Sequence, residues 1–227
     1  MRRTRRFLSL AAAATAAVLV LGACSASSNG VADLGPDAIL DQAKEAVDGA
    51  SSVHIAGDFP SQGSTVALDL TLSATGDATG TVTNGGLALN LLSVDGTSWY
   101  TADEAFWEAR VGPELAVQLG GKYVEIPQTD TTFDAFIDWR TFWDKGVLSP
   151  SGTVTKGEET TFDGQPAIQL VDSSDDGVLY VSTTGEALPL GIEGGKGGKV
   201  TFTDWNADVS VAAPPPEDVV DPAKLSG

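Results

Sequence analysis

The feature that most constrains the fold is a strict alternation of apolar and polar residues, which predicts β-strands with one buried face. From Val66 to Leu72 every second residue is Val or Leu, and Asp69 and Thr71 stand between them. Successive side chains of a strand point to opposite faces, so this segment is expected to meet a core on one side and water on the other. Similar patterns predict strands at about 53–59, 78–83, 87–94, 97–101, 122–126, 152–161, 165–172, 177–182, 187–193 and 198–204.

Turn signals separate many of these segments and indicate antiparallel hairpins. The pairs are Asp95-Gly96, Asp163-Gly164, Asp176-Gly177 and Thr184-Gly185. Such pairs tolerate the left-handed backbone that tight hairpin turns require. Residues 36–211 contain no strong linker and are expected to form one unit. The predicted fold class is α+β, mainly β.

Two regions of the chain favour helices instead. Pro36 suits the first position of a helix that runs to Asp48, and Gly49 stands where a C-terminal cap belongs. Between 102 and 148 the alternation breaks, and short helices are expected at 103–109, 113–120 and 131–145. On a helical wheel of the last segment, Arg140 intrudes on the apolar arc and Phe142 falls outside it. The members of that arc are Phe133, Phe136, Ile137, Trp139 and Trp143.

The N-terminus has the pattern of a bacterial lipoprotein signal peptide. Basic residues precede an apolar stretch from Phe7 to Leu21, and the run Leu21-Gly22-Ala23-Cys24 is a lipobox. The apolar stretch is shorter than the ~20 residues that a transmembrane helix needs. Cleavage is therefore expected after residue 23, with a diacylglyceryl group on Cys24 that anchors the protein to the extracytoplasmic face of the cell membrane. Residues 24–35 are expected to form a flexible tether, whereas Sec or twin-arginine export stays open.

Charge and composition exclude several classes of function. The chain has 13 Lys and Arg against 31 Asp and Glu, and four arginines lie in the signal peptide, so the mature protein has a balance of 9 − 31 = −22. Such a surface repels nucleic acid. His54 is the only histidine and Cys24 the only cysteine, so a base–nucleophile pair and a zinc site are not expected. The prediction includes no catalytic residue, no metal and no cofactor.

Two other acidic or glycine-rich segments have simple structural interpretations. Asp172 to Gly177 offers oxygen atoms but lacks the spacing of a calcium loop, so a hairpin turn is the expected structure. Gly194 to Gly198 does not open a helix and is expected to be a flexible loop. Residues 212–227, which include Pro214-Pro215-Pro216, are expected to form an extended tail.

The order of these elements resembles the LppX/LprG-type lipoproteins of actinobacteria, within the wider LolA/LolB-like superfamily. The residues that support the resemblance are Ser52–Ile55, Val94–Gly96 before Trp99-Tyr100, Phe162–Gly164, Leu179–Ser182 before Leu188–Leu190, and Val200–Trp205 followed by Pro214-Pro215. The resemblance implies a strongly curved antiparallel sheet, a half-barrel, with helices across its concave face. It also implies that a lipid or glycolipid is held, and carried, in an apolar cavity between the sheet and the helices.

Aromatic and apolar residues of the central helices are the candidates for lining that cavity. They are Phe106, Trp107, Leu115, Leu119, Phe133, Phe136, Ile137, Trp139 and Trp143. The alternative is that these side chains fill the core, in which case the protein would be a non-catalytic envelope module that binds a protein partner. An enzyme acting on wall polymers is a third hypothesis and would need clustered carboxylates in a cleft. The presence or absence of a cavity distinguishes the lipid-binding hypothesis from the hypothesis of an envelope module that binds a protein partner.

Overall fold

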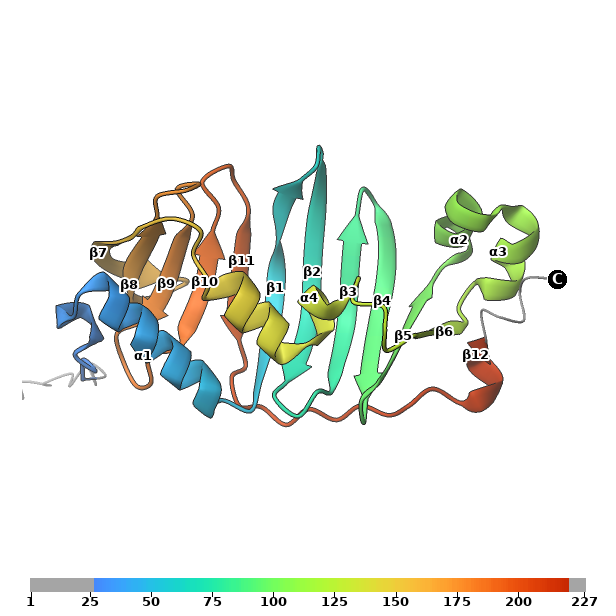
Figure 1. The fold of residues 1–227 in the computed structure, drawn as a ribbon, viewed down its shortest axis with the longest axis horizontal. Coiled ribbons are helices and arrows are strands. Elements are labelled where there is room, and N and C mark those ends of the chain that lie inside the picture. Colours follow the sequence, from blue (N-terminus) through green and yellow to red (C-terminus); the bar gives the residue numbers. More distant parts are fainter. Residues whose placement is uncertain (1–26, 221–227) are drawn as a thin grey trace, which may run out of the picture.

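Twelve strands form one sheet in the computed structural model, which describes residues 27–220 (Figure 1). The order across the sheet is β12-β6-β5-β4-β3-β2-β1-β11-β10-β9-β8-β7. The strands are β1 (Ser52–Ser61), β2 (Ser64–Ser73), β3 (Ala78–Asn84), β4 (Leu87–Val94), β5 (Thr97–Ala102), β6 (Tyr123–Ile126), β7 (Val154–Phe162), β8 (Gln165–Asp172), β9 (Val178–Ser182), β10 (Pro189–Glu193), β11 (Lys199–Thr203) and β12 (Val219–Val220). The expected α+β, mainly β fold with an open curved sheet is confirmed.

The two halves of the chain each form a meander, and the halves join in the middle of the sheet. Strands β1–β6 follow one another on one side of the junction, and β7–β11 do so on the other. At the junction β1 pairs with β11, with His54 opposite Thr203 and Gly57 opposite Val200. Among the described residues, every pairing of named strands is antiparallel except that of β12 with β6. Strands far apart in the sequence therefore share one continuous hydrogen-bonded surface.

Short helical segments cross one face of this sheet (Figure 1). α1 lies over the half that contains β7–β11, and α4 with η2 crosses the middle of the sheet. α2 and α3 form a pair at the end next to β5 and β6. The bounds are η1 (Val31–Asp33), α1 (Pro36–Gly49), α2 (Glu104–Val111), α3 (Pro113–Leu119), α4 (Asp134–Ile137), the π-helix η2 (Thr141–Val147) and η3 (Pro216–Asp218).

The expected continuous helix at 131–145 is wrong, because the chain breaks at Asp138. That residue has an extended backbone (φ −99°, ψ 116°), and its carboxylate accepts a hydrogen bond from the N–H of Thr141 at 2.8 Å. Asp138 therefore caps a second helical segment, which continues as the π-helix η2. The change of register brings Phe142 into the core, where only 9% of it is exposed, so its expected place outside the apolar arc is also wrong.

Both ends of the described chain pack on the sheet. Ser28 bridges to Thr184, the side chain of Asn29 donates to the carbonyl of Ser182, and Val31 is buried. Residues 28–33 therefore belong to the folded unit and not to the expected tether, whereas Cys24 lies outside the described residues. In the Pro-rich tail, β12 pairs with β6 in parallel, which the sequence did not indicate.

The helices and the concave face of the sheet enclose the main core. Its most buried large side chains include Trp143, Phe202, Ile39, Ile55 and Leu70. A second, smaller cluster contains Phe162, Ala167, Tyr180 and Leu190. Because Tyr180 lies between Leu179 and Val181 of the main core, strand alternation places the small cluster on the outer face. The core therefore has two layers in the half of the sheet that contains β7–β11.

Candidate functional site

An apolar cavity of about 530 Å³ lies between the sheet, α1 and the α4–η2 segment. The helical side contributes Leu40 from α1, Phe136 from α4, and Phe142 and Val147 from η2. The floor consists of alternate strand residues that face the helices: Phe59, Leu68, Val154, Leu170, Leu179, Ile192 and Val200. The volume falls in the range of pockets that bind small organic ligands, about 300–1,000 Å³. An apolar lining of this kind favours hydrocarbon over polar ligands.

Three connecting segments surround the polar mouth of the cavity. They are residues 149–151 after η2, the turn between β8 and β9, and the loop between β10 and β11. The segments pack closely because glycines stand where they meet. A Cβ atom on Gly152 would approach Oδ1 of Asp172 to 2.5 Å, and one on Gly195 would overlap the carbonyl oxygen of Asp175. The mouth is therefore built from closely packed turns, and the expected loop at 194–198 is one of these segments.

Asp172 holds two of these segments together. Its carboxylate accepts hydrogen bonds from the N–H groups of Ser174 and Ser151, both at 2.8 Å. These bonds, that from Ser174 first, hold the pKa of Asp172 below its ordinary value of 3.8 because they favour the charged carboxylate. The expected hairpin turn at 172–177 is confirmed, and its first residue also fixes the segment that follows η2.

Of the nine residues that the sequence suggested for the cavity, only Phe136 lines it. Trp143 has no exposed surface, and its ring packs against those of Phe202 and Trp205 at centroid distances of 4.9 and 5.2 Å. Ile137 and Trp139 are also buried in the core. The α4–η2 segment is thus a core element on one side and a cavity wall on the other.

The remaining suggested residues pack together near α2 and α3, in a cluster of aromatic and leucine side chains. Tyr100 of β5 lies between Phe133 and Trp107, with ring centroids 5.6 and 5.5 Å away. Phe106 packs edge-on against Trp107. Leu119 is buried in the same core, and Leu115 packs against it. This cluster stabilises the end of the sheet that contains β5 and β6, away from the cavity lining.

Sequence analysis missed most of the cavity lining. Leu40 lies on the expected helix that begins at Pro36, and Leu68 and Leu170 lie on expected strands, but a core position and a cavity position have the same pattern. Alternation indicates that a side chain faces inward, and it does not indicate whether another side chain fills the space opposite.

Two buried indole groups lack hydrogen-bond partners. The Nε1 atoms of Trp107 and Trp143 have none in the part of the chain that the structure describes. A buried unsatisfied donor costs about 1–3 kcal/mol. The packed position of η2 is therefore held by apolar contacts and is opposed by the unsatisfied N–H of Trp143.

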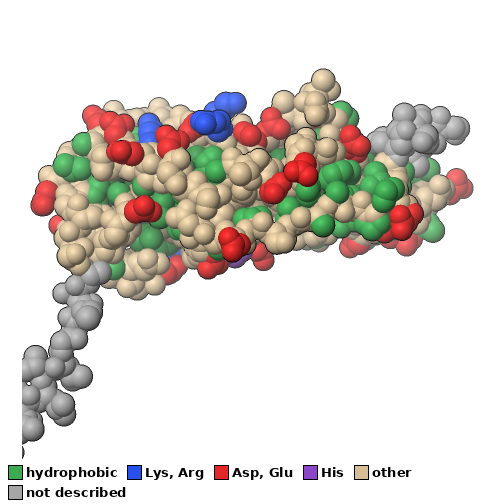
Figure 2. All heavy atoms as spheres, turned by 90° about the horizontal axis from the view of Figure 1, so that it is seen from below, with side chains coloured by type: hydrophobic (Ala, Val, Ile, Leu, Met, Phe, Trp, Pro, Cys, Tyr) green, Lys and Arg blue, Asp and Glu red, His purple; other side chains and the backbone are tan. Residues whose placement is uncertain are grey.

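The surface around the site is acidic. Figure 2 shows acidic side chains spread along the length of the molecule and few basic ones. Among residues 27–220, no group of three or more His, Cys, Asp and Glu side chains is placed to hold a metal ion. Within the same residues, no helix combines the length and apolar character that crossing a membrane requires. The acidic surface thus surrounds a site whose own lining is apolar.

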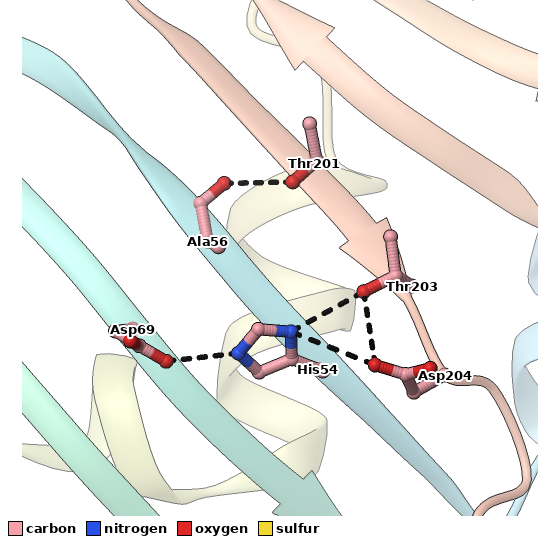
Figure 3. Close-up of polar contacts among 6 residues, drawn as sticks. All are labelled: His54, Ala56, Asp69, Thr201, Thr203 and Asp204. Atoms are coloured by element: carbon pink, nitrogen blue, oxygen red, sulfur yellow. Dashed lines mark hydrogen bonds and ion pairs between the residues drawn. The ribbon is translucent and has the colours of Figure 1, made fainter. Parts of the chain in front are cut away.

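His54 lies on the outer face of the sheet, away from the cavity (Figure 3). Its Nε2 is 2.8 Å from Oδ1 of Asp69, and its Nδ1 is 3.2 Å from the hydroxyl of Thr203 and 3.8 Å from Asp204. These contacts connect β1 to β2 and β11 across three neighbouring strands. The arrangement ties the two halves of the sheet together at their junction.

No protein-family model matches the chain, and no curated protein matches it. Solved structures similar to it include an uncharacterized conserved protein from Thermus thermophilus (11% identity over 82% of this chain and 98% of that chain, TM-score 0.43). The Pseudomonas aeruginosa MucA/MucB complex matches at 16% identity over 82% of this chain and 59% of that chain, with a TM-score of 0.35. The LolA superfamily protein NE2245 from Nitrosomonas europaea matches at 10% identity over 78% and 96%, with a TM-score of 0.31.

These similarities are too low to assign the chain to a family. They include a LolA superfamily protein, the wider group named from the sequence. The narrower resemblance to LppX and LprG stays a prediction. The functional argument therefore rests on the geometry of the cavity.

Proposed function

We propose that the protein is an extracytoplasmic lipoprotein that is anchored to the cell membrane through Cys24 and shelters the acyl chain of a lipid or glycolipid in the apolar cavity. The observation that carries the proposal is the space of about 530 Å³ between α1, the α4–η2 segment and the concave face of the sheet. A core that served only for stability would be expected to fill such a space, because protein interiors are close-packed. The resemblance to LppX/LprG-type lipoproteins supports the same role.

The energetics of binding follow from the lining. Each methylene group removed from water contributes about 0.8 kcal/mol, and a bilayer offers the same gain, so transfer between bilayer and cavity is nearly balanced. Small differences in packing then decide whether the lipid is taken up or released. This balance suits a protein that carries a lipid without consuming energy.

Entry of a lipid requires one wall to move, and the α4–η2 segment is the proposed lid. It combines a break at Asp138 with a π-helix, and the unsatisfied indole N–H of Trp143 opposes its packed position. The chain just after η2 is held at the mouth by one hydrogen bond, which the N–H of Ser151 donates to the carboxylate of Asp172. A lid with a break between its two helical parts and a polar fastening after the second part can bend at the break when the fastening opens.

A pair of variants of adjacent residues in β7 tests the cavity directly. Val154 lines the cavity, whereas Thr155 is exposed and points to the opposite face of the same strand. Because the sheet, helices and core all lie within residues 27–220, a soluble form that starts at Ser25 retains the site. Val154→Trp should occupy the cavity and abolish binding of 1-monopalmitoylglycerol, followed by native mass spectrometry. Thr155→Trp should bind this lipid as the unmodified protein does.

The anchor is tested separately in the full chain. Cys24→Ser should release the protein from the membrane fraction of the cells that express it and remove the mass of the lipid. If the soluble form takes up no lipid while remaining folded, the lipid-binding proposal is wrong. The alternative of an envelope module that binds a protein partner would then be favoured.

A further inference from the structure

We infer that the cavity selects a lipid with an uncharged headgroup. The inference rests on the proposed function and specifies its ligand. The observation that carries it is the arrangement of charges at the mouth of the cavity.

Four charged residues contribute to the lining: Asp172, Asp175, Glu193 and Lys199. Two of them are engaged on the outer face of the sheet. The amine of Lys199 pairs with Asp163 and lies 4.3 Å from the centre of the Phe162 ring. The carboxylate of Glu193 accepts a hydrogen bond from the hydroxyl of Tyr180 at 2.8 Å. Both partners belong to the outer side, so neither charge faces a headgroup.

The charges that remain at the mouth are both carboxylates of the β8–β9 turn. Asp172 is tied to Ser151 and Ser174, and Asp175 accepts a hydrogen bond from the N–H of Gly177 at 2.9 Å. Lys196 stands at the exposed tip of the β10–β11 loop and is not among the lining residues. A headgroup at the mouth would therefore meet two carboxylates that hydrogen bonds hold in place.

This arrangement disfavours phosphate and favours hydroxyl groups. An anionic headgroup would approach two carboxylates, whereas Lys199, the lysine among the lining residues, is paired with Asp163. Like charges repel most strongly within the Debye length of about 10 Å at 0.1 M salt. A hydroxylated headgroup can instead donate to those carboxylates and exchange hydrogen bonds with Ser149, Ser151 and Ser174, which also line the mouth. The acidic surface of the whole protein acts in the same direction.

Two probes with one palmitoyl chain each test the headgroup preference in the soluble form that starts at Ser25. They are 1-monopalmitoylglycerol and palmitoyl-lysophosphatidylglycerol, each titrated below its critical concentration for aggregation. The monoacylglycerol should bind about tenfold more tightly than the anionic lysolipid at low salt, and the difference should shrink as salt is raised.

A matched pair of charge variants tests whether the preference for an uncharged headgroup arises at the mouth of the cavity. Asp175→Asn keeps the side-chain acceptor of the turn but removes a charge from the mouth, so the preference for the uncharged probe should fall about threefold. Asp95→Asn makes the same change in the β4–β5 turn and should leave the preference unaltered. Equal binding of the neutral and anionic single-chain probes would overturn the headgroup inference alone. Binding of neither probe would overturn the proposed function as well.

Discussion

The backbone N–H of Ser151 donates to the carboxylate of Asp172 over 2.8 Å, and this bond fastens the segment after η2 to the turn between β8 and β9. Because the same carboxylate also accepts from Ser174, one side chain connects the end of the lid to the sheet. The packing of Gly152 against Asp172 shows that the two segments meet without room for a larger residue.

The hydrogen bond between Ser151 and Asp172 should depend on pH in the acid range. The folded-state pKa of Asp172 is lower than its ordinary value of 3.8, so the carboxylate stabilises the folded mouth above that value. The contribution should be lost as the pH falls through the lowered pKa. Hydrogen exchange of residues 149–153 should therefore accelerate, relative to the rest of the sheet, below about pH 3.8 and not between about pH 5 and 7.

Asp172→Asn supplies the control for that experiment. It should raise exchange in residues 149–153 already at neutral pH and remove the acid-dependent step. Asp176→Asn alters the neighbouring exposed position of the same turn and should preserve the step. An identical pH profile in the Asp172 variant and the unmodified protein would contradict the assignment.

Variants of Trp143 and Phe136 should separate an effect on the stability of the fold from an effect on lipid binding. Trp143 has no exposed surface, so Trp143→Ala should lower the free energy of unfolding by about 3–5 kcal/mol. Phe136 is half-buried and faces the cavity, so Phe136→Ala should lower the free energy of unfolding by about 1–2 kcal/mol but weaken binding of 1-monopalmitoylglycerol clearly. Urea unfolding and lipid titration measure the two effects. A Phe136 variant with unchanged lipid affinity would show that α4 does not line the occupied site.

Asp138 should act as a helix cap within the lid. Asp138→Ala removes the acceptor for the N–H of Thr141 and should lower the free energy of unfolding by about 0.5–2 kcal/mol. Asp134→Ala removes the same charge from the start of α4, where no side-chain cap bond is formed, and should cost at most about half as much. Chemical denaturation of the two variants distinguishes a cap from a general effect of charge.

Gly80 should be required for the close packing of β3 on β2. Its φ is +143°, and a Cβ atom there would overlap the carbonyl oxygen of Asp69. Gly80→Ala should therefore lower the free energy of unfolding by about 2–4 kcal/mol, since both the backbone conformation and the space exclude a side chain. Gly49→Ala, at the end of α1 with free space around it, should change stability by no more than about 1 kcal/mol. Similar losses in both variants would contradict the packing argument.

Asn29 should anchor the N-terminal segment to the sheet. Its side chain donates to the carbonyl of Ser182 at 3.1 Å, and its N–H donates to the carbonyl of Thr183 at 2.9 Å. Asn29→Ala should cost about 1 kcal/mol and raise hydrogen exchange in residues 28–33. Gln42→Ala, which changes an exposed residue of α1, should have neither effect. The comparison shows whether the folded unit begins at Ser28 or at Pro36.

The local pattern of the sequence was sufficient to predict most of the secondary structure. The alternation from Val66 to Leu72 predicted β2, and the Asp-Gly pairs at 95–96 and 163–164 predicted the turns that join β4 to β5 and β7 to β8. These features depend on neighbouring residues, because the two-residue period and the left-handed turn conformation are local properties. The break at Asp138 was missed because a helical wheel assumes a constant rotation per residue, which a cap followed by a π-helix violates.

The amino-acid sequence was thus sufficient to predict a mainly β fold, a helix near the N-terminus, helices in the central region and an acidic surface. Only the tertiary structure established that β1 pairs with β11. It also placed Trp143 in the core and Phe136 at the cavity. The hydrogen bond from Ser151 to Asp172 at the mouth likewise depends on the folded structure. The physical reason is that periodicity identifies which side of a strand or helix is apolar. Only the packing of segments distant in sequence determines whether the space on that side is filled or left open.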